Sequence, residues 1–316
     1  MRLSHRSHDD DSGKTREQRQ ALPPLSVTTL RVALSAPGEA TLYETASGMA
    51  YDPSYRHKGD EEEGGDDEKC DEGGDEKDDE KDDEKGDDEG GGEESSAAPE
   101  DRNTIPGTGK NRAREFERIL RCRQAATHPA IYQRSMARKT GDEGRNRLAD
   151  ALAAAPAPEV SSKMARLARD VVENARDERS VVFCDWSEEM LLVESELIRV
   201  GVPPTDVHAF HGGLAVDERD RVLEAFREGG PGSVLLAQIR CAGVGLNLQC
   251  ASRAYLMRPQ WNPAVERQAI GRLHRSGQQR PVTVVRLIAA GTIDEACLWR
   301  QARKLECVRR IMVDKK

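Results

Sequence analysis

From residue 160 onward, the hydrophobic and polar positions follow two different periods in turn. Short runs that are apolar throughout predict buried strands, and between them apolar residues recur every three or four positions, which predicts amphipathic helices. Strands are expected at 180–186, 206–210, 233–238, 253–257 and 282–288, and helices at 160–171, 187–201, 216–230, 262–277 and from 292 onward.

This alternation predicts an α/β fold. Strands that are apolar on both faces need cover on both faces, which a parallel sheet between two layers of helices provides. Ligands of such sheets bind beyond the carboxyl ends of the strands. The residues expected there are aromatic, glycine, amide and cationic, a composition suited to a nucleotide or a phosphate, and they occupy 185–186, 211–213, 240–247 and 259–262.

Before residue 160 the periodic signal is weaker. Residues 27–34 predict a short strand. Residues 113–138 predict a helix that closes near His128, because Pro129 disfavours helical geometry in the residue before it. The first residues lack the apolar region of a secretory signal, and no apolar run approaches the roughly 18 residues that span a membrane. We therefore expect no membrane association.

Charge is distributed very unevenly along the chain. Residues 60–94 hold 22 acidic residues against four lysines, a net charge of −18, whereas the whole chain carries −9, so the remainder carries +9. Because Cys70 is its only apolar residue, this acidic run is predicted to be disordered. It is either a solvated spacer or a binding segment for basic proteins such as histones. The basic remainder suggests phosphate-bearing partners.

The seven cysteines form no CxxC pair and have no regular spacing. This pattern favours reduced thiols in a cytosolic or nuclear protein and predicts no metal site. We divide the chain into an N-terminal segment (1–59), an acidic insertion (60–112), a helical segment (113–150) and an α/β domain (160–313).

The first motif with candidate chemistry is CAGVGLNLQ at 241–249, directly after a predicted strand. Gly243 and Gly245 would let backbone amides approach an anion, and Asn247 would add a side-chain amide. Tight packing of a strand against a helix would explain two spaced glycines equally well. The motif therefore indicates an anion site only in combination with others.

Two further motifs follow along the chain. In WNP, Asn262 and Pro263 start a helix, and Trp261 is either a core residue or part of a binding surface. In QAIGRLHRSGQ (268–278), Gln268, Arg272 and Arg275 are expected to share one face of that helix. Paired arginines suit bidentate contacts with phosphate oxygens, although an ordinary solvated helix face is the alternative. The glycine motif, WNP and QAIGRLHRSGQ are expected to follow one another at successive strand ends of one sheet, which favours the phosphate site.

Taken in order, these segments resemble a known family. The succession SVVFCDW, HGG, AGVGLNL, PQWNP, QAIGRLHRSGQ and RLIAAGTIDE resembles the second RecA-like lobe of the SWI/SNF-like DNA translocases, within the superfamily-two helicases. The stretches LPPLSVTTLRVALS and LRCRQAATHPAIY resemble the connecting region between the two lobes. The segment PQWNPAVERQAIGR is most similar to the repair and transcription branch of that family. Some members of that branch carry a RING finger, but this sequence contains no RING ligand set.

The resemblance implies roles for individual residues. Arg272 and Arg275 would be arginine fingers that meet the γ-phosphate of ATP held by the opposite lobe. The other implied positions are a cofactor-binding set and a set that meets the DNA backbone or couples the lobes. The first comprises Gln268, which begins the arginine-finger motif, with Gly243, Gly245 and Asn247, which match the motif that couples the nucleotide to DNA; the second comprises Trp186, His211, Arg240 and Trp261. The sequence departs from the family pattern at Gln238, Ala242 and Arg258, which affects DNA contact more than the fingers.

Family members bind ATP and Mg²⁺ between two lobes, and nothing before residue 160 supplies a phosphate loop or a strand-end acidic pair. The resemblance thus implies the C-terminal lobe of a nuclear ATPase that moves on double-stranded DNA in chromatin remodelling or DNA repair. A first lobe in the same protein or in trans would complete it, and we expect negligible ATP hydrolysis from this chain alone. The alternative is a non-catalytic protein that binds DNA and histones.

Overall fold

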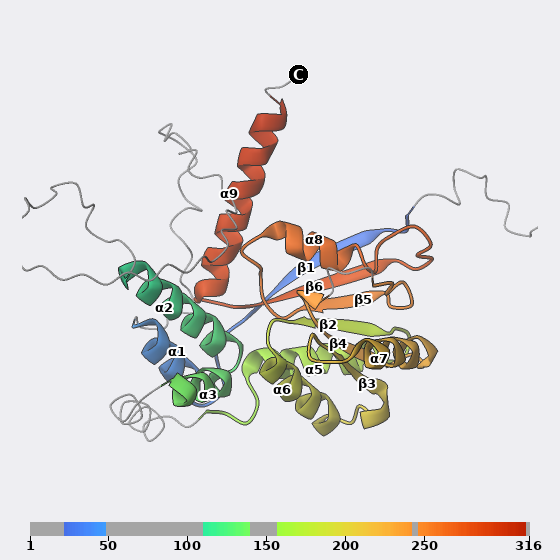
Figure 1. The fold of residues 1–316 in the computed structure, drawn as a ribbon, viewed down its shortest axis with the longest axis horizontal. Coiled ribbons are helices and arrows are strands. Elements are labelled where there is room, and N and C mark those ends of the chain that lie inside the picture. Colours follow the sequence, from blue (N-terminus) through green and yellow to red (C-terminus); the bar gives the residue numbers. More distant parts are fainter. Residues whose placement is uncertain (1–21, 49–109, 140–156, 242–245, 314–316) are drawn as a thin grey trace, which may run out of the picture.

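A computed structural model describes residues 22–48, 110–139, 157–241 and 246–313. Their centre is a six-stranded sheet in which neighbouring strands run parallel, in the order β1–β6–β5–β2–β4–β3 (Figure 1). The predicted α/β fold with a parallel sheet is confirmed. Its strands are β1 (Leu25–Val32), β2 (Ser180–Cys184), β3 (Val207–Phe210), β4 (Val234–Gln238), β5 (Arg253–Leu256) and β6 (Val282–Ala289).

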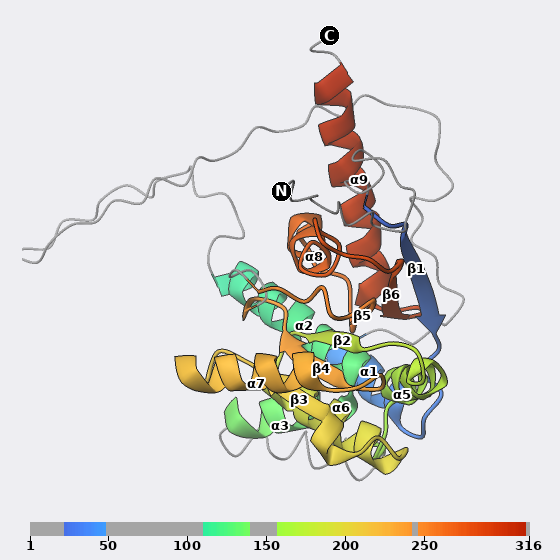
Figure 2. The ribbon, with the colours of Figure 1, turned by 90° about the vertical axis from the view of Figure 1, so that its right-hand side faces the viewer.

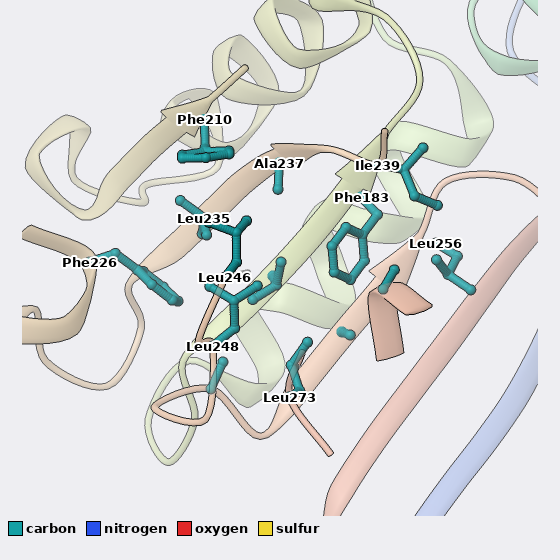
Figure 3. Packing of buried hydrophobic residues seen from close by; sticks show 14 of the residues in the cluster. Phe183, Phe210, Phe226, Leu235, Ala237, Ile239, Leu246, Leu248, Leu256 and Leu273 are labelled. Atoms are coloured by element: carbon teal, nitrogen blue, oxygen red, sulfur yellow. The ribbon is translucent and has the colours of Figure 1, made fainter. Parts of the chain in front are cut away.

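Helices cover both faces of the sheet because alternate side chains of each strand point to opposite faces. In β2, Val181 and Phe183 join the core beneath α7 and α8, whereas Val182 and Cys184 join the core beneath α5 and α6. Figure 3 shows Phe183 packed among leucines of the first core. The four covering helices are α5 (Ser162–Asn174), α6 (Ser187–Arg199), α7 (Val216–Glu228) and α8 (Pro263–Ile270).

One edge of the sheet comes from far upstream in the sequence. All eight residues of β1 pair in parallel with β6, from Leu25 opposite Val282 to Val32 opposite Ala289. The sequence analysis assigned this stretch to a segment outside the α/β domain, although it predicted a strand there. Local patterns cannot show the pairing, because the partner strand lies about 250 residues away in the chain.

A three-helix unit packs at the carboxyl end of β6. It consists of α1 (Glu39–Ser47), α2 (Lys110–Thr127) and α3 (Pro129–Lys139), and its core contains Tyr43, Ala125, Tyr132 and Ala289. The predicted closure of a helix near His128 is confirmed, because α2 ends at Thr127. The acidic run at 60–94 lies outside the described residues.

The last helix, α9 (Ile293–Val313), begins against the three-helix unit and projects away from the sheet (Figures 1 and 2). The backbone N–H of Ile293 donates to the Tyr43 hydroxyl at 2.8 Å. In the next residue, the buried Asp294 carboxylate pairs with Lys163 Nζ of α5 at 2.5 Å. The base of α9 is therefore fixed to both α1 and α5.

A buried arginine fastens the three-helix unit to the centre of the sheet. Arg258 follows β5 and is 2% exposed. Its guanidinium forms ion pairs with Glu189 at 3.1 Å and Asp185 at 3.3 Å. It also donates to the Arg123 carbonyl at 3.4 Å and to the Thr127 hydroxyl, both in α2. A charge in a dry site needs such partners, since an unpaired buried ion is costly.

Two negative findings apply to the described ranges. No helix there combines the length and apolar character that crossing a membrane requires. In the same ranges, no group of three His, Cys, Asp or Glu side chains is placed to hold a metal ion.

We predict that His128 makes stability depend on pH. Its Nδ1 accepts from the Ala130 N–H at 3.1 Å, and burial lowers the pKa of His128 from 6.5 to about 4, against a hydrogen bond with the Glu159 carbonyl. The unfolded chain therefore binds the proton at higher pH. The free energy of unfolding should be highest above pH 6.5 and fall by about 3 kcal/mol towards pH 4. Denaturant titrations measure this fall.

The matched control is His128→Gln, which removes the titrating ring. Its free energy of unfolding should lack this component of the fall between pH 6.5 and 4. An identical pH dependence in both proteins would assign the effect to other groups.

We also predict that Arg258→Met is strongly destabilising. It leaves the buried Glu189 carboxylate without its cation and leaves Asp185 with Arg123 alone, which should lower the free energy of unfolding by about 3–5 kcal/mol. Urea denaturation measures the loss. Arg258→Lys retains the charge without the planar fork and should cost less. A loss below about 1 kcal/mol for Arg258→Met would contradict the fastening role.

Candidate functional site

The residues expected at the site fall into two groups at opposite edges of the sheet. Trp186 follows β2 and Trp261 follows β5, at the carboxyl edge, whereas Arg272 and Arg275 follow α8. The sequence analysis placed the arginines at this strand edge too, and that expectation was wrong. A helix that follows a parallel strand crosses back over the sheet, so the residues after α8 lie near the beginning of β5.

The predicted helix face of Gln268 and the two arginines is not formed. The helix α8 ends at Ile270, and the Arg272 and Leu273 N–H groups donate to the carbonyls three residues earlier, at 3.1 and 3.0 Å. The chain tightens here because Leu273 is drawn into the core, with no exposed surface (Figure 3). Arg272 and Arg275 therefore belong to a turn, in which Arg275 is exposed and Arg272 half-buried.

Two amide side chains hold this arginine turn, residues 271–278. The buried Gln278 donates to the carbonyls of Gln249, Ala251 and Leu273 at 3.0–3.2 Å, and its oxygen accepts from the next two backbone N–H groups. Gly277 has φ 101°, and a Cβ there would meet the Gln249 amide at 3.0 Å. The last residues of the motif thus shape the turn, a role that sequence analysis missed.

The arginine turn lies directly beside the end of the glycine motif. The Leu248 N–H donates to the Arg272 carbonyl at 3.0 Å, and the Gln249 side chain donates to the Arg275 carbonyl at 3.4 Å. Leu246 and Leu248 pack into the core (Figure 3), and the intervening Asn247 is exposed. The two motifs are therefore brought together, whereas Gly243 and Gly245, with Ala242, lie outside the described residues.

At the carboxyl edge, Gln238 joins the ends of three strands. Its amide nitrogen donates to the Asp185 carbonyl, and its oxygen accepts from the Gly212 N–H, both at 3.3 Å. His211 Nδ1 accepts from the Gly213 N–H at 3.2 Å, and Arg240 is exposed just beyond β4. This departure from the family pattern therefore has a structural use, since it holds the loops after β2, β3 and β4 together.

The two tryptophans of this edge are each placed against arginines. The Arg258 guanidinium lies 3.7 Å from the centre of the Trp186 ring, and Trp261 lies between Arg123 at 5.8 Å and Arg300 at 5.4 Å. These distances are those of cation–π contacts. Sequence analysis missed Arg123 and Arg300, because they come from α2 and α9 and no local motif marks them.

Part of the chain is similar to known proteins. Residues 162–277 match the model of the helicase conserved C-terminal domain. The chain is 40% identical over 157 residues to DNA repair protein RAD5B of Arabidopsis thaliana, covering 49% of this chain and 12% of the relative. It is 41% identical over 140 residues to DNA repair protein RAD5 of Kluyveromyces lactis, covering 43% and 12%. The chain thus spans only a small part of these relatives.

The fold has a counterpart among solved structures. The crystal structure of the C-terminal part of the Fun30 ATPase domain superposes with a TM-score of 0.56 and 16% identity, covering 89% of this chain and 90% of that chain. The family resemblance drawn from the motifs is thereby confirmed. Residues 162–277 are thus a helicase C-terminal domain, and the chain is similar in sequence to the RAD5 DNA repair proteins and in fold to the C-terminal part of the Fun30 ATPase domain.

Proposed function

We propose that this lobe supplies Arg272 and Arg275 to an ATP molecule held by a first RecA-like lobe, in an ATP-dependent enzyme that moves on double-stranded DNA. The observation that carries the proposal is the backbone hydrogen bond from Leu248 to Arg272, which sets the arginine turn beside Asn247. The family match and the relatives named as DNA repair proteins support it.

The arginine turn holds its own guanidinium groups in a fixed position. Leu273 is buried in the core, and Gln278 hydrogen-bonds to the chain just before β5. Because the backbone of the turn is already fixed, binding a phosphate would require little further loss of chain entropy. Guanidinium groups fit phosphate oxygens and stabilise the charge of phosphoryl transfer, an effect worth about 10³ to 10⁵ in rate. Mg²⁺ and most of the phosphate contacts would come from the first lobe.

The carboxyl edge is the proposed DNA surface. Arg240 is exposed there, and His211, Trp186 and Trp261 border it. Outside the acidic run the chain carries a net charge of +9, which favours phosphate-bearing partners. We also propose a nuclear location, which is supported by relatives named for DNA repair and for regulation of chromatin.

The ATPase proposal is tested by fusing the full chain to the first lobe of the Kluyveromyces lactis relative. We expect DNA-stimulated, Mg²⁺-dependent hydrolysis that Arg272→Ala or Arg275→Ala lowers about 10³-fold or more. The isolated chain should show negligible turnover.

The matched control for that assay is Arg267→Ala, an exposed arginine of α8 that lies just before the turn. It should change the rate less than about twofold. Full activity after Arg272→Ala, or hydrolysis by the isolated chain that requires Arg272, would overturn the proposal.

The DNA surface is tested by measuring duplex affinity at several salt concentrations by fluorescence anisotropy. Replacing Arg240 by Ala should weaken binding and lower the magnitude of the salt slope by about 0.9, because one phosphate contact is lost. Arg221→Ala, an exposed position on α7, should leave the slope unchanged. Equal slopes for the Arg240→Ala variant and the parent chain would rule out this contact.

A further inference from the structure

The outer half of α9 carries a row of exposed cations. At about 100° per residue, Arg300, Arg303, Lys304 and Arg310 fall within a sector of about 120°, along about 15 Å of helix. All four are exposed. Figures 1 and 2 show that this part of α9 extends beyond the neighbouring helices and strands. We call these four residues the basic face.

The basic face is poorly neutralised by its own helix. Residues 300–310 contain five basic residues and one acidic residue, Glu306, which pairs with Arg310 at 3.3 Å and Arg309 at 3.8 Å. Like charges three and four residues apart, such as Arg300 with Arg303 and Lys304, destabilise a helix. An anionic partner along this face would remove that repulsion.

We propose that the basic face of α9 is the docking site of the acidic run, residues 60–94, of the same chain. The two are complementary in charge, because the run carries −18 and residues 300–310 carry +4. The run also repeats its acidic residues along its whole length, so many registers can place carboxylates opposite the four cations. Such a contact is electrostatic and should weaken as salt is added.

The chain connection brings the two partners within reach. Tyr43 of α1 contacts Ile293 at the base of α9, and α1 is capped by Gly48. From Gly48 to Cys70 there are 22 residues, and a flexible chain of that length spans at least about 26 Å on average. From Ile293 to Cys307, α9 rises about 21 Å. Tethering at this length gives the acidic run an effective concentration near α9 on the order of millimolar. An untethered partner of equal affinity must be present above that concentration to displace it.

Two native thiols provide the test. Cys70 lies in the acidic run, and the exposed Cys307 lies in the middle of the basic face, at an angle between Arg303 and Lys304. The full chain is treated with a short bismaleimide reagent, monomer and crosslinked dimer are separated, and each is analysed by peptide mass spectrometry. We expect a Cys70–Cys307 crosslink that Cys70→Ser removes. In 1 M salt, where the screening length is about 3 Å, its yield should fall at least fivefold.

Two adjacent arginines serve as a matched pair of variants. Arg310 belongs to the basic face, whereas Arg309 points to the opposite side; both pair with Glu306, and their side chains are 75% and 78% exposed. Arg310→Glu should lower the crosslink yield at least threefold, and Arg309→Glu should change it less than 1.5-fold. The rate at which a monofunctional maleimide labels Cys307 corrects for altered thiol reactivity.

Several results would overturn the proposal. Absence of the crosslink, its full persistence in 1 M salt, or equal effects of the two variants would each do so. Crosslinks between Cys307 residues of two molecules would assign the face to a second copy instead. A yield unaffected by Arg310→Glu, together with weaker duplex binding by that variant, would assign it to DNA.

Discussion

Strands that are apolar on both faces impose the constraint on which the rest of this structure depends. Each must be followed by a segment that crosses one face of the sheet and returns the chain to the starting edge. Functional groups are thereby divided between two edges. Trp186 and Trp261 stay where strands end, while Arg272 and Arg275 lie where α8 has brought the chain back. Leu246 and Leu248 pack against the same face, and Leu248 meets the arginine turn there.

Buried and half-buried polar side chains then fix the positions of the loops on this sheet. Arg258 gathers two carboxylates and the end of α2, and Gln238 and Gln278 each bind backbone groups from separate segments. Such groups need full satisfaction, because a buried donor or charge without a partner is costly. They consequently admit few alternative loop positions. Arg258 and Gln238, which depart from the family pattern, and Gln278, which ends the arginine motif, thus fix the loops at the two edges of the sheet.

The charge of the chain is organised on a larger scale. Its acidic residues are concentrated between α1 and α2, whereas α9 and the strand edges carry exposed arginines. The fold places α1 against the base of α9, although Tyr43 and Ile293, which meet there, are 250 residues apart in the chain. Under the proposed docking, an external polyanion would compete with the acidic run for the cations of α9.

The sequence by itself determined the class of fold, the order of strands and helices after residue 160, and the family, because apolar periodicity and ordered motifs are local properties. It did not reveal that residues 25–32 join the sheet beside β6, since pairing at that separation leaves no local pattern. It also predicted a helix through Arg272 and Arg275, where burial of Leu273 ends regular hydrogen bonding and forms a turn. Only the tertiary structure decided which arginines surround Trp261 and what surrounds Arg258, because those contacts depend on packing between distant segments.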